Sequence, residues 1–165
     1  MKTSKKICSV ALLKKQITRE RKAGKTIAFT NGCFDILHYG HVSYLEAAKK
    51  DDFRILIVGL NSDASVRSLE KGPERPIVPQ AERAAVLAGL AAVDYVVIFN
   101  EPTPYELIKK LQPDILLKGA DWKGKDVAGG DVVKARGGRV EFVKYLPGLS
   151  TTNVIEKIKK LCAKE

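Results

Sequence analysis

The chain contains two histidines, and they lie three residues apart in the run His38-Tyr39-Gly40-His41. This spacing places the two imidazoles on one face of the first turn of a helix. A helix N-terminus attracts anions through its unpaired N–H groups and its dipole, and a glycine there lets a ligand approach the backbone closely. The run therefore predicts a phosphate site. Surface histidines without a ligand are the alternative, and zinc is disfavoured because no third ligand follows at a suitable spacing.

The segment that leads to the histidines is Asn31-Gly32-Cys33-Phe34-Asp35. Gly32 allows a tight turn next to a ligand, and Phe34 can pack under the sheet. Asp35 can either orient a histidine or cap a turn, and the two alternatives stay open. We expect Cys33 to be a small buried residue rather than a nucleophile, because nothing marks its thiol as activated.

A second candidate site is the run G-L-S-T-T at residues 148–152, which precedes the last predicted helix. Residues 150–153 can cap that helix, and Asn153 with Glu156 has the spacing of a capping box. The same run can bind phosphate at the helix N-terminus. The two roles are compatible.

Two familiar phosphate motifs are absent. Gly24-Lys25-Thr26 resembles the end of a P-loop, but Arg19 stands where the upstream glycine is required, and the segment precedes a strand instead of following one. No G-x-G-x-x-G occurs, which argues against a dinucleotide-binding enzyme.

The elements that would position these runs alternate between strand and helix. Residues 54–60, R-I-L-I-V-G-L, are typical of a strand buried on both faces of a parallel sheet. Strands are predicted over residues 26–30, 54–60, 95–99, 115–117 and 138–143, and helices over residues 9–22, 41–50, 79–91, 104–111 and 153–161. The alternation predicts an α/β fold with three layers, a doubly wound parallel sheet of five strands in a Rossmann-like arrangement. Ligands bind such sheets at the carboxyl ends of the strands, so we also expect the irregular stretches 67–79 and 119–131 to contribute to a site.

The 165 residues form one predicted domain, residues 1–165, with a basic N-terminal helix within residues 1–24. Apolar residues make up 45% of the chain, as in a globular protein, and no apolar run approaches the roughly 20 residues that cross a bilayer. The three cysteines, Cys8, Cys33 and Cys162, form no C-x-x-C pair, which argues against a disulfide scaffold or a cysteine-based zinc site. We expect a cytoplasmic protein with no membrane partner.

The net charge of +10 suggests nucleic acid as a partner, but its distribution argues against that function. Residues 1–25 hold nine basic groups and one acid, so the other 140 residues carry 20 basic and 18 acidic groups, a net charge of +2. No nucleic-acid-binding motif accompanies the basic residues. We therefore expect no nucleic-acid partner and interpret the basic segment as a solvated helix.

Taken together, the motifs resemble those of the cytidylyltransferase-like nucleotidyltransferases. T-N-G-C-F-D-I-L-H-Y-G-H at residues 30–41 and G-L-S-T-T at 148–152 match the H-x-G-H and I-S-T-T signatures of that family. Within it, G-L-N-S-D-A-S-V at 59–66, R-P-I-V-P at 75–79, A-E-R at 81–83 and L-K-G-A-D-W at 117–122 look like the adenylyltransferases that make ADP-heptose from heptose 1-phosphate. The resemblance extends over residues 8–162 and favours the standalone form over the bifunctional kinase–adenylyltransferase.

The resemblance implies transfer of AMP from ATP to heptose 1-phosphate, with Mg²⁺ accompanying ATP, pyrophosphate as the other product and a homo-oligomeric protein. The product would be a precursor of lipopolysaccharide core or another surface glycan. The resemblance gives the catalytic residues as His38, His41 and Lys71. It gives the nucleotide-binding residues as Asn31, Gly32, Cys33, Phe34, Asp35, Gly40, Gly119, Asp121, Trp122, Ser150, Thr151 and Thr152, and the substrate-binding residues as Asn61, Asp63, Arg67, Arg75 and Arg83. No side chain is identified as a metal ligand.

One departure from related enzymes bears on the substrate. Glycerol-phosphate cytidylyltransferases carry R-T-E-G-I-S-T-T, whereas this chain has Tyr145 in place of the arginine and Pro147 in place of the glutamate. The difference argues against cytosine and against glycerol 3-phosphate. Use of CTP or GTP with another phosphorylated acceptor, and a nucleotide sensor without turnover, remain the alternatives.

Overall fold

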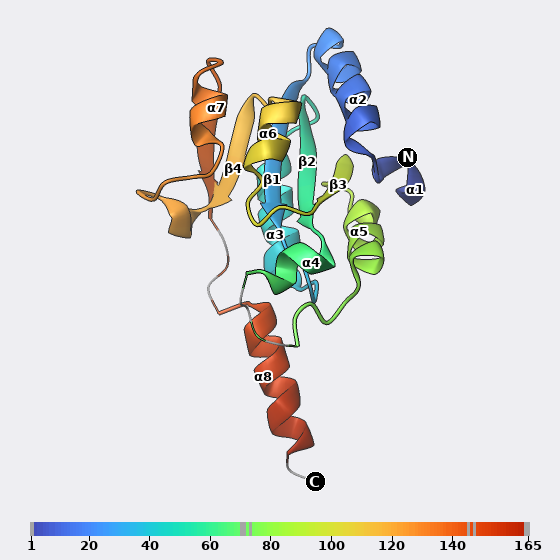
Figure 1. Cartoon of the computed structure of the whole chain (residues 1–165), viewed down its shortest axis with the longest axis vertical. Coiled ribbons are helices and arrows are strands. Elements are labelled where there is room, and N and C mark those ends of the chain that lie inside the picture. The colour runs from blue at the N-terminus through green and yellow to red at the C-terminus, as the bar shows by residue number, and fades with distance from the viewer. Residues whose placement is uncertain (1, 70–71, 73, 145, 147, 164–165) are drawn as a thin grey trace.

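Five parallel strands form a single sheet in the order β3-β2-β1-β4-β5 (Figure 1). The computed structural model describes residues 2–69, 72, 74–144, 146 and 148–163. The strands are β1 (Thr26–Gly32), β2 (Arg54–Asn61), β3 (Tyr95–Phe99), β4 (Ile115–Gly119) and β5 (Arg139–Val143). Each neighbouring pair is parallel, so the predicted five-stranded parallel sheet is confirmed.

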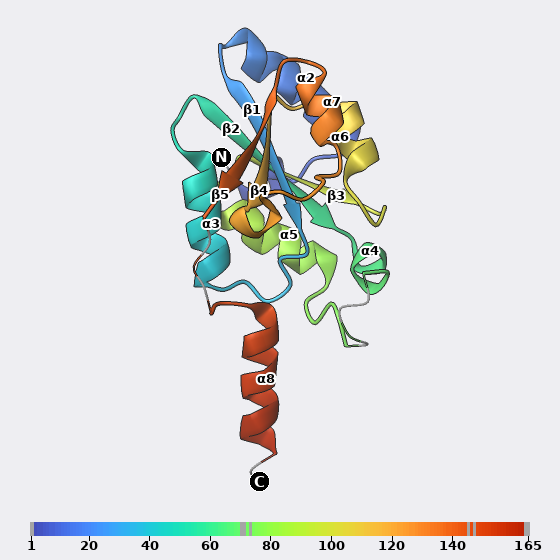
Figure 2. The same ribbon diagram turned by 90° about the vertical axis from the view of Figure 1, so that its left-hand side faces the viewer.

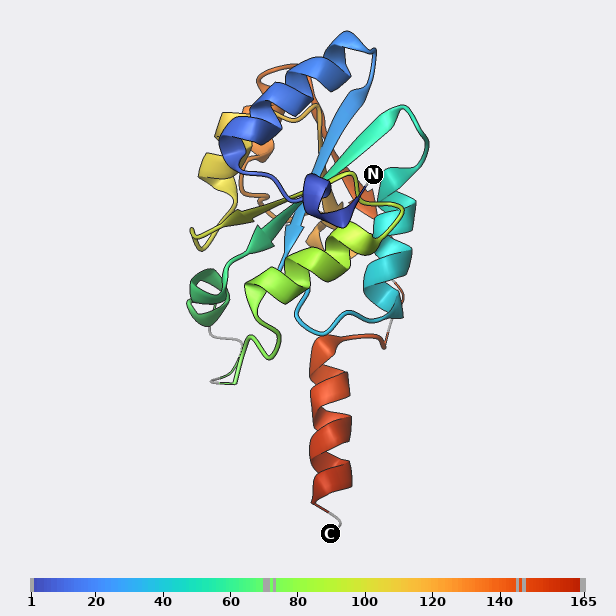
Figure 3. The same ribbon diagram turned by 90° about the vertical axis from the view of Figure 1, so that its right-hand side faces the viewer.

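Helices cover the two faces of this sheet, which lies edge-on between them in Figure 3. One face carries α2 (Val10–Lys22), α6 (Tyr105–Leu111) and α7 (Gly130–Lys134), and the other carries α3 (Tyr39–Lys49) and α5 (Gln80–Gly89). Each face has its own core: Leu13, Phe29 and Ile108 are buried on the first, and Leu45, Val58 and Leu87 on the second. The predicted doubly wound, three-layer fold is thereby confirmed.

The winding reverses between β1 and β4. Strands β1, β2 and β3 are joined through helices of the α3/α5 face, whereas β3, β4 and β5 are joined through α6 and α7 on the opposite face. Chains that leave two neighbouring strands toward opposite faces open a crevice at the carboxyl ends of those strands. The fold therefore places a ligand site beside the ends of β1 and β4.

Several elements differ from the sequence predictions at their ends. β1, β2 and β4 extend to Gly32, Asn61 and Gly119, one or two residues beyond the predicted strands. Short helices α1 (Thr3–Lys6), α4 (Asp63–Arg67), α7 and η1 (Ala120–Trp122) were not predicted, because three to five residues are too few to show helical periodicity. The ends of β1, β2 and β4, with α4 and η1, lie where the chain passes from the sheet into the loops at its carboxyl edge.

The basic N-terminal segment forms a helix that packs on the core. Ser9 caps α2 by accepting a hydrogen bond from the Leu12 N–H at 3.3 Å, while Leu13 and Ile17 are buried. Gly24, with a φ of 75°, follows the helix end as predicted. None of the described helices is long and apolar enough to cross a membrane.

The last helix, α8 (Thr151–Cys162), points away from the rest of the molecule in all three views (Figures 1, 2 and 3). Ser150 caps it by accepting from the Asn153 N–H at 3.0 Å, so the capping box predicted to start at Asn153 is wrong. Asn153 lies inside the helix and donates its side-chain amide to the Gly148 carbonyl. Thr151 is the buried residue among the described positions of α8, and Ile158 and Leu161 are exposed.

Candidate functional site

A cavity of about 960 Å³ opens at the carboxyl ends of the strands. Most of the predicted site residues line it: Asn31, Gly32, Cys33, Phe34, Asp35, His38, Gly40, His41, Asn61, Arg75, Gly119, Asp121, Trp122, Ser150, Thr151 and Thr152. These residues come from the ends of β1, β2 and β4, from η1, from the loop before α5 and from the N-termini of α3 and α8. The structure brings these residues together at the predicted edge of the sheet, while ligand binding there and the roles of the individual residues stay predictions.

The two histidines are stacked at the start of α3. Their ring centroids are 3.8 Å apart with 24° between the planes, and the His41 centroid lies 5.1 Å from that of Phe34. His38 is the N-cap of α3. Among the described residues, the Nδ1 atoms of both rings are buried without a hydrogen-bond partner. Buried polar atoms without partners are costly, so two nitrogens in this condition beside a helix N-terminus indicate an anion-binding position.

The surroundings of the histidines keep both rings neutral in the free protein. Burial lowers the pKa of His41 to about 4, with further contributions from His38 and Arg75. Burial also lowers the pKa of His38. An anion bound beside these rings would favour their charged form and raise both pKa values.

The lowered pKa of His41 predicts a specific loss of stability in acid. An ordinary histidine has a pKa near 6.5, so between pH 6.5 and pH 4 the unfolded chain binds a proton that the folded chain does not. The contribution of neutral His41 to the free energy of unfolding is present above pH 6.5 and decreases as the pH falls toward 4. We expect the melting temperature of the wild type to fall more steeply than that of H41Q over this range. A difference between the two proteins that is independent of pH would contradict this prediction.

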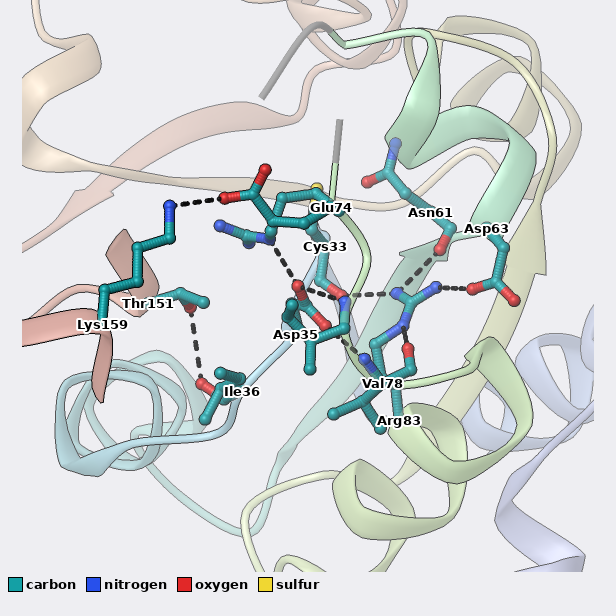
Figure 4. A network of polar contacts seen from close by, with 12 residues as sticks. Cys33, Asp35, Ile36, Asn61, Asp63, Glu74, Val78, Arg83, Thr151 and Lys159 are labelled. Atoms are coloured by element: carbon teal, nitrogen blue, oxygen red, sulfur yellow. Dashed lines mark hydrogen bonds and ion pairs between the residues drawn. The ribbon is translucent and has the colours of Figure 1, made fainter. Parts of the chain in front are cut away.

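Asp35 holds a loop in place through its carboxylate. Its carboxylate accepts hydrogen bonds from the Arg75 Nε and from the backbone N–H groups of Ile77 at 3.0 Å and Val78 at 2.8 Å (Figure 4). Among the described residues, this carboxylate forms no hydrogen bond to a histidine or to the turn that follows it. The turn itself depends on Phe34, whose φ is 44°, and not on a positive φ at Gly32. Asp35 therefore fixes the segment that carries Arg75 against the cavity.

Arg83, predicted to bind substrate, is engaged by backbone carbonyls and a carboxylate away from the cavity. Its side chain is fully buried and does not line the cavity. The guanidinium donates to the carbonyls of Val78, Cys33 and Asn61 and to the Asp63 carboxylate (Figure 4). These contacts join α5 to the loop that precedes it, to the chain just after β1, to the end of β2 and to the start of α4. Asp63 is engaged by this ion pair at 2.6 Å and Arg67 is exposed, and neither residue lines the cavity.

The N-terminus of α8 closes the other side of the cavity. Thr151 donates its hydroxyl to the Ile36 carbonyl at 3.4 Å (Figure 4). A Cβ on Gly40 would lie 3.1 Å from both the His38 ring and the Leu149 Cβ, so a glycine at this position lets the loop before α8 approach the start of α3. The backbone thus brings two helix N-termini and the histidine pair to one cavity, which is the arrangement expected for a polyphosphate.

Sequence reasoning missed three polar residues of the cavity, Tyr44, Thr103 and Lys118. Tyr44 exchanges a hydrogen bond with the Thr30 hydroxyl at 2.9 Å, and Lys118 donates to the Asn31 side-chain oxygen at 2.6 Å. Lys118 lies inside an apolar strand, and only strand alternation could have shown that it points into the crevice. Lys71, Tyr145 and Pro147, which the sequence analysis singled out, lie outside the described residues.

The described part of the chain does not form a metal-binding site from its own side chains. No group of three or more His, Cys, Asp or Glu residues there could hold a metal ion. Of the two carboxylates that line the cavity, Asp35 is engaged by Arg75 and two backbone amides. A divalent cation in this cavity would therefore take most of its ligands from phosphate and water, as Mg²⁺ commonly does.

Comparison with known families places this cavity in context. Residues 29–157, which include both histidines and the start of α8, match the model of the cytidylyltransferase-like family. The chain belongs to the cytidylyltransferase-like family. The prediction that it is a nucleotidyltransferase is confirmed by this membership, since the match contains the H-x-G-H and S-T-T runs.

The curated relatives of this family member are longer proteins. It is 55% identical over 139 residues to a protein named bifunctional protein HldE from Syntrophotalea carbinolica, which covers 84% of this chain and 28% of that protein. It is 54% identical over 155 residues to bifunctional protein HldE of Magnetococcus marinus, covering 94% and 31%. The chain therefore spans less than a third of the length of these relatives.

Solved structures support the same fold. A lipopolysaccharide core biosynthesis protein from Thermoplasma volcanium superposes with a TM-score of 0.59 at 29% identity, covering 73% of this chain and 96% of that one. Pantothenate synthetase from Thermus thermophilus superposes with a TM-score of 0.62 at 17% identity, covering 94% and 70%. The second likeness concerns the fold alone.

Proposed function

We propose that the protein transfers AMP from ATP to heptose 1-phosphate, producing ADP-heptose and pyrophosphate. The observation that carries the transfer of a nucleotidyl group is the pair of buried, unpartnered imidazole nitrogens at the start of α3, in the same cavity as the N-terminus of α8. Support for the heptose acceptor comes from the L-K-G-A-D-W and G-L-S-T-T-N runs and from the names of the relatives, one of which refers to lipopolysaccharide core biosynthesis.

In the proposed reaction, a phosphate oxygen of the acceptor attacks the α-phosphorus of ATP. The bond from that phosphorus to the β-phosphate bridging oxygen breaks, and pyrophosphate leaves with its electron pair. No covalent intermediate with the protein is required. The protein contributes by positioning the two phosphates and by neutralising charge as the leaving group departs.

Each half of the cavity has a proposed part in this reaction. The N–H groups at the start of α3 and α8, with the Ser150, Thr151 and Thr152 side chains, bind the β- and γ-phosphates. His38 and His41 donate to phosphate oxygens and take up protons as the anion binds. Gly119, Asp121 and Trp122, with the backbone of Cys33 and Phe34, frame the nucleoside. We propose Mg²⁺ as part of the substrate, the Mg²⁺–ATP complex.

Three further predictions from the sequence belong to this proposal. These are a cytoplasmic location, a homo-oligomeric state and the absence of a nucleic-acid partner. Analytical ultracentrifugation would test the second, and binding of a labelled RNA at two salt concentrations would test the third.

The proposal is tested by measuring pyrophosphate release with Mg²⁺ while ATP, CTP and GTP are each combined with heptose 1-phosphate and glycerol 3-phosphate. We expect release with ATP and heptose 1-phosphate and little with the other five pairs. Release with a different pair would keep the nucleotidyl transfer and overturn the substrate assignment. Silence with every pair, together with ATP binding in calorimetry, would favour a nucleotide sensor.

A further inference from the structure

The carboxyl ends of three adjacent strands carry a row of polar side chains on one face of the sheet. Asn61 ends β2, Asn31 lies near the end of β1 and Lys118 lies near the end of β4. Two residues earlier on β1 and β4, Phe29 and Leu116 are aligned across the strands and belong to the core under α2, α6 and α7. Because side chains alternate along a strand, Asn31 and Lys118 point to that same face.

Asn61 shares this orientation. Along β2, Ile55 and Ile57 belong to the core of the α6 face, whereas Leu56, Val58 and Leu60 belong to the core of the α3 face. Asn61 lies an even number of positions after Ile55 and Ile57, so its side chain points to the same face of the sheet as theirs. The residues Asn61, Asn31 and Lys118, which we call the polar row, all line the cavity.

The ammonium group of Lys118 is buried beside an uncharged hydrogen-bond acceptor and an aromatic ring. The residue is 8% exposed. Its Nζ donates to the Asn31 side-chain oxygen at 2.6 Å and lies 5.1 Å from the centroid of the Trp122 ring. In the described part of the chain no ion pair engages this Nζ, although Asp121 is near enough for its charge to be felt. A buried cation without a bonded carboxylate is costly unless an anion reaches it.

Burial also lowers the pKa of Lys118 to about 8, against a smaller opposing effect from Asp121. The ammonium form is therefore present at neutral pH and is lost above pH 8. A phosphate bound beside it would favour the charged form and raise the pKa. Its charge state thus depends on whether an anion occupies this part of the cavity.

The polar row and the histidine pair face the cavity from opposite faces of the sheet. His38 and His41 belong to α3, which packs on one face, whereas the row points to the face of α6 and α7. Thr103 and Pro104, which precede α6, line the cavity together with the row. In an in-line displacement the attacking and leaving oxygens stand on opposite sides of the phosphorus. If the triphosphate lies at the helix N-termini, the attacking phosphate must approach from the other side.

We propose that Lys118 binds the phosphate group of the acceptor, with Asn31 orienting its ammonium and Asn61 completing a polar row for the sugar phosphate. This inference rests on the proposed function. Lys118 stays protonated throughout: the acceptor oxygen forms its bond to the α-phosphorus as pyrophosphate leaves, and no proton moves to or from the lysine. Its contribution is to neutralise the attacking phosphate, which would otherwise be repelled by the triphosphate.

The kinetic test compares K118M, K118R and, as a matched control, K123M. Lys123 is exposed and does not line the cavity. Loss of a charged hydrogen bond to phosphate predicts a KM for heptose 1-phosphate about 10- to 100-fold higher in K118M. The Kd of a non-hydrolysable ATP analogue, measured by calorimetry, is expected to change less than threefold, and K123M is expected to match the wild type. A K118M protein with an unchanged acceptor KM would overturn the proposal.

The pH dependence of kcat/KM distinguishes the effect of the charge at residue 118 from the effect of the shape of its side chain. In the wild type, kcat/KM for heptose 1-phosphate is expected to fall above about pH 8, as Lys118 loses its proton. In K118R the value at neutral pH is expected to be reduced because the guanidinium has a different shape, but the fall above pH 8 should be absent, because arginine stays charged. A decline with the same midpoint in both proteins would assign the alkaline limb to another group and count against Lys118.

A binding test on the wild type does not depend on turnover. Lysines labelled by reductive ¹³C-dimethylation give separate NMR signals, and the Lys118 signal is identified by its absence in K118R. We expect it to shift when heptose 1-phosphate or inorganic phosphate is added in the presence of the ATP analogue. Turnover of heptose 1-phosphate with an unmoved Lys118 signal would reject this inference and leave the proposed function standing. A signal that moves with inorganic phosphate but not with heptose 1-phosphate, without turnover, would reject the proposed function and keep a phosphate site at Lys118.

Discussion

Replacing His41 with alanine is expected to lower kcat by at least about 100-fold while the protein stays folded. The ring lies between His38 and Phe34 at the start of α3, and its Nδ1 is buried without a partner in the described structure. A donor placed where charge accumulates on the leaving phosphates stabilises the transition state more than the bound substrate. We therefore expect kcat to fall much more than the affinity for ATP.

The matched control for H41A is Y39A. Tyr39 lies between the two histidines in the same helical turn, but it is 64% exposed and does not line the cavity. Its removal should leave kcat within about twofold of the wild type, since surface substitutions away from a site have small effects. Steady-state pyrophosphate release and circular dichroism on the three proteins would decide the matter. A kcat for H41A within threefold of the wild type would remove His41 from the chemistry.

The sheet and the main helices could be predicted because each carries its own pattern. Residues 55–60 are apolar throughout, as is typical of a central parallel strand, and β2 is buried at all eight positions. The histidine run could be located because the fold brings the carboxyl ends of all parallel strands to one edge. For these features, local sequence and overall topology agree.

The roles of the buried charged residues could not be predicted in the same way. Arg83 and Asp35 have the types expected in a phosphate site, but each is engaged by backbone groups that are distant in sequence, 50 residues away for Arg83 and Cys33 and 43 for Asp35 and Val78. Lys118 shows the opposite case, because a single lysine in a strand gives no motif. Which charges face the ligand and which support the loops depends on the tertiary arrangement, and residue types alone do not determine it.

Replacing Arg83 with methionine is expected to lower the free energy of unfolding more than either R83K or R19M does. The change leaves the carbonyls of Val78, Cys33 and Asn61 and the Asp63 carboxylate without their donor. Removing one partner of a buried ion pair costs about 3–5 kcal/mol of the free energy of unfolding. For a chain of 165 residues this corresponds to a decrease of roughly 10 °C in the melting temperature. Because the Cys33 and Asn61 backbones line the cavity, nucleotide affinity should decrease as well.

The comparison that isolates the buried contacts of Arg83 uses R19M and R83K. Arg19 forms its ion pair with Glu20 with 67% of its own side chain exposed, so R19M should change the free energy of unfolding far less than R83M. R83K keeps the charge but loses the planar fork that reaches several acceptors at once, and we expect it to lose most of the stability that R83M loses. Urea denaturation gives the three free energies. If R83M were as stable as R19M, the four contacts would be incidental, and Arg83 would again be a candidate for binding substrate.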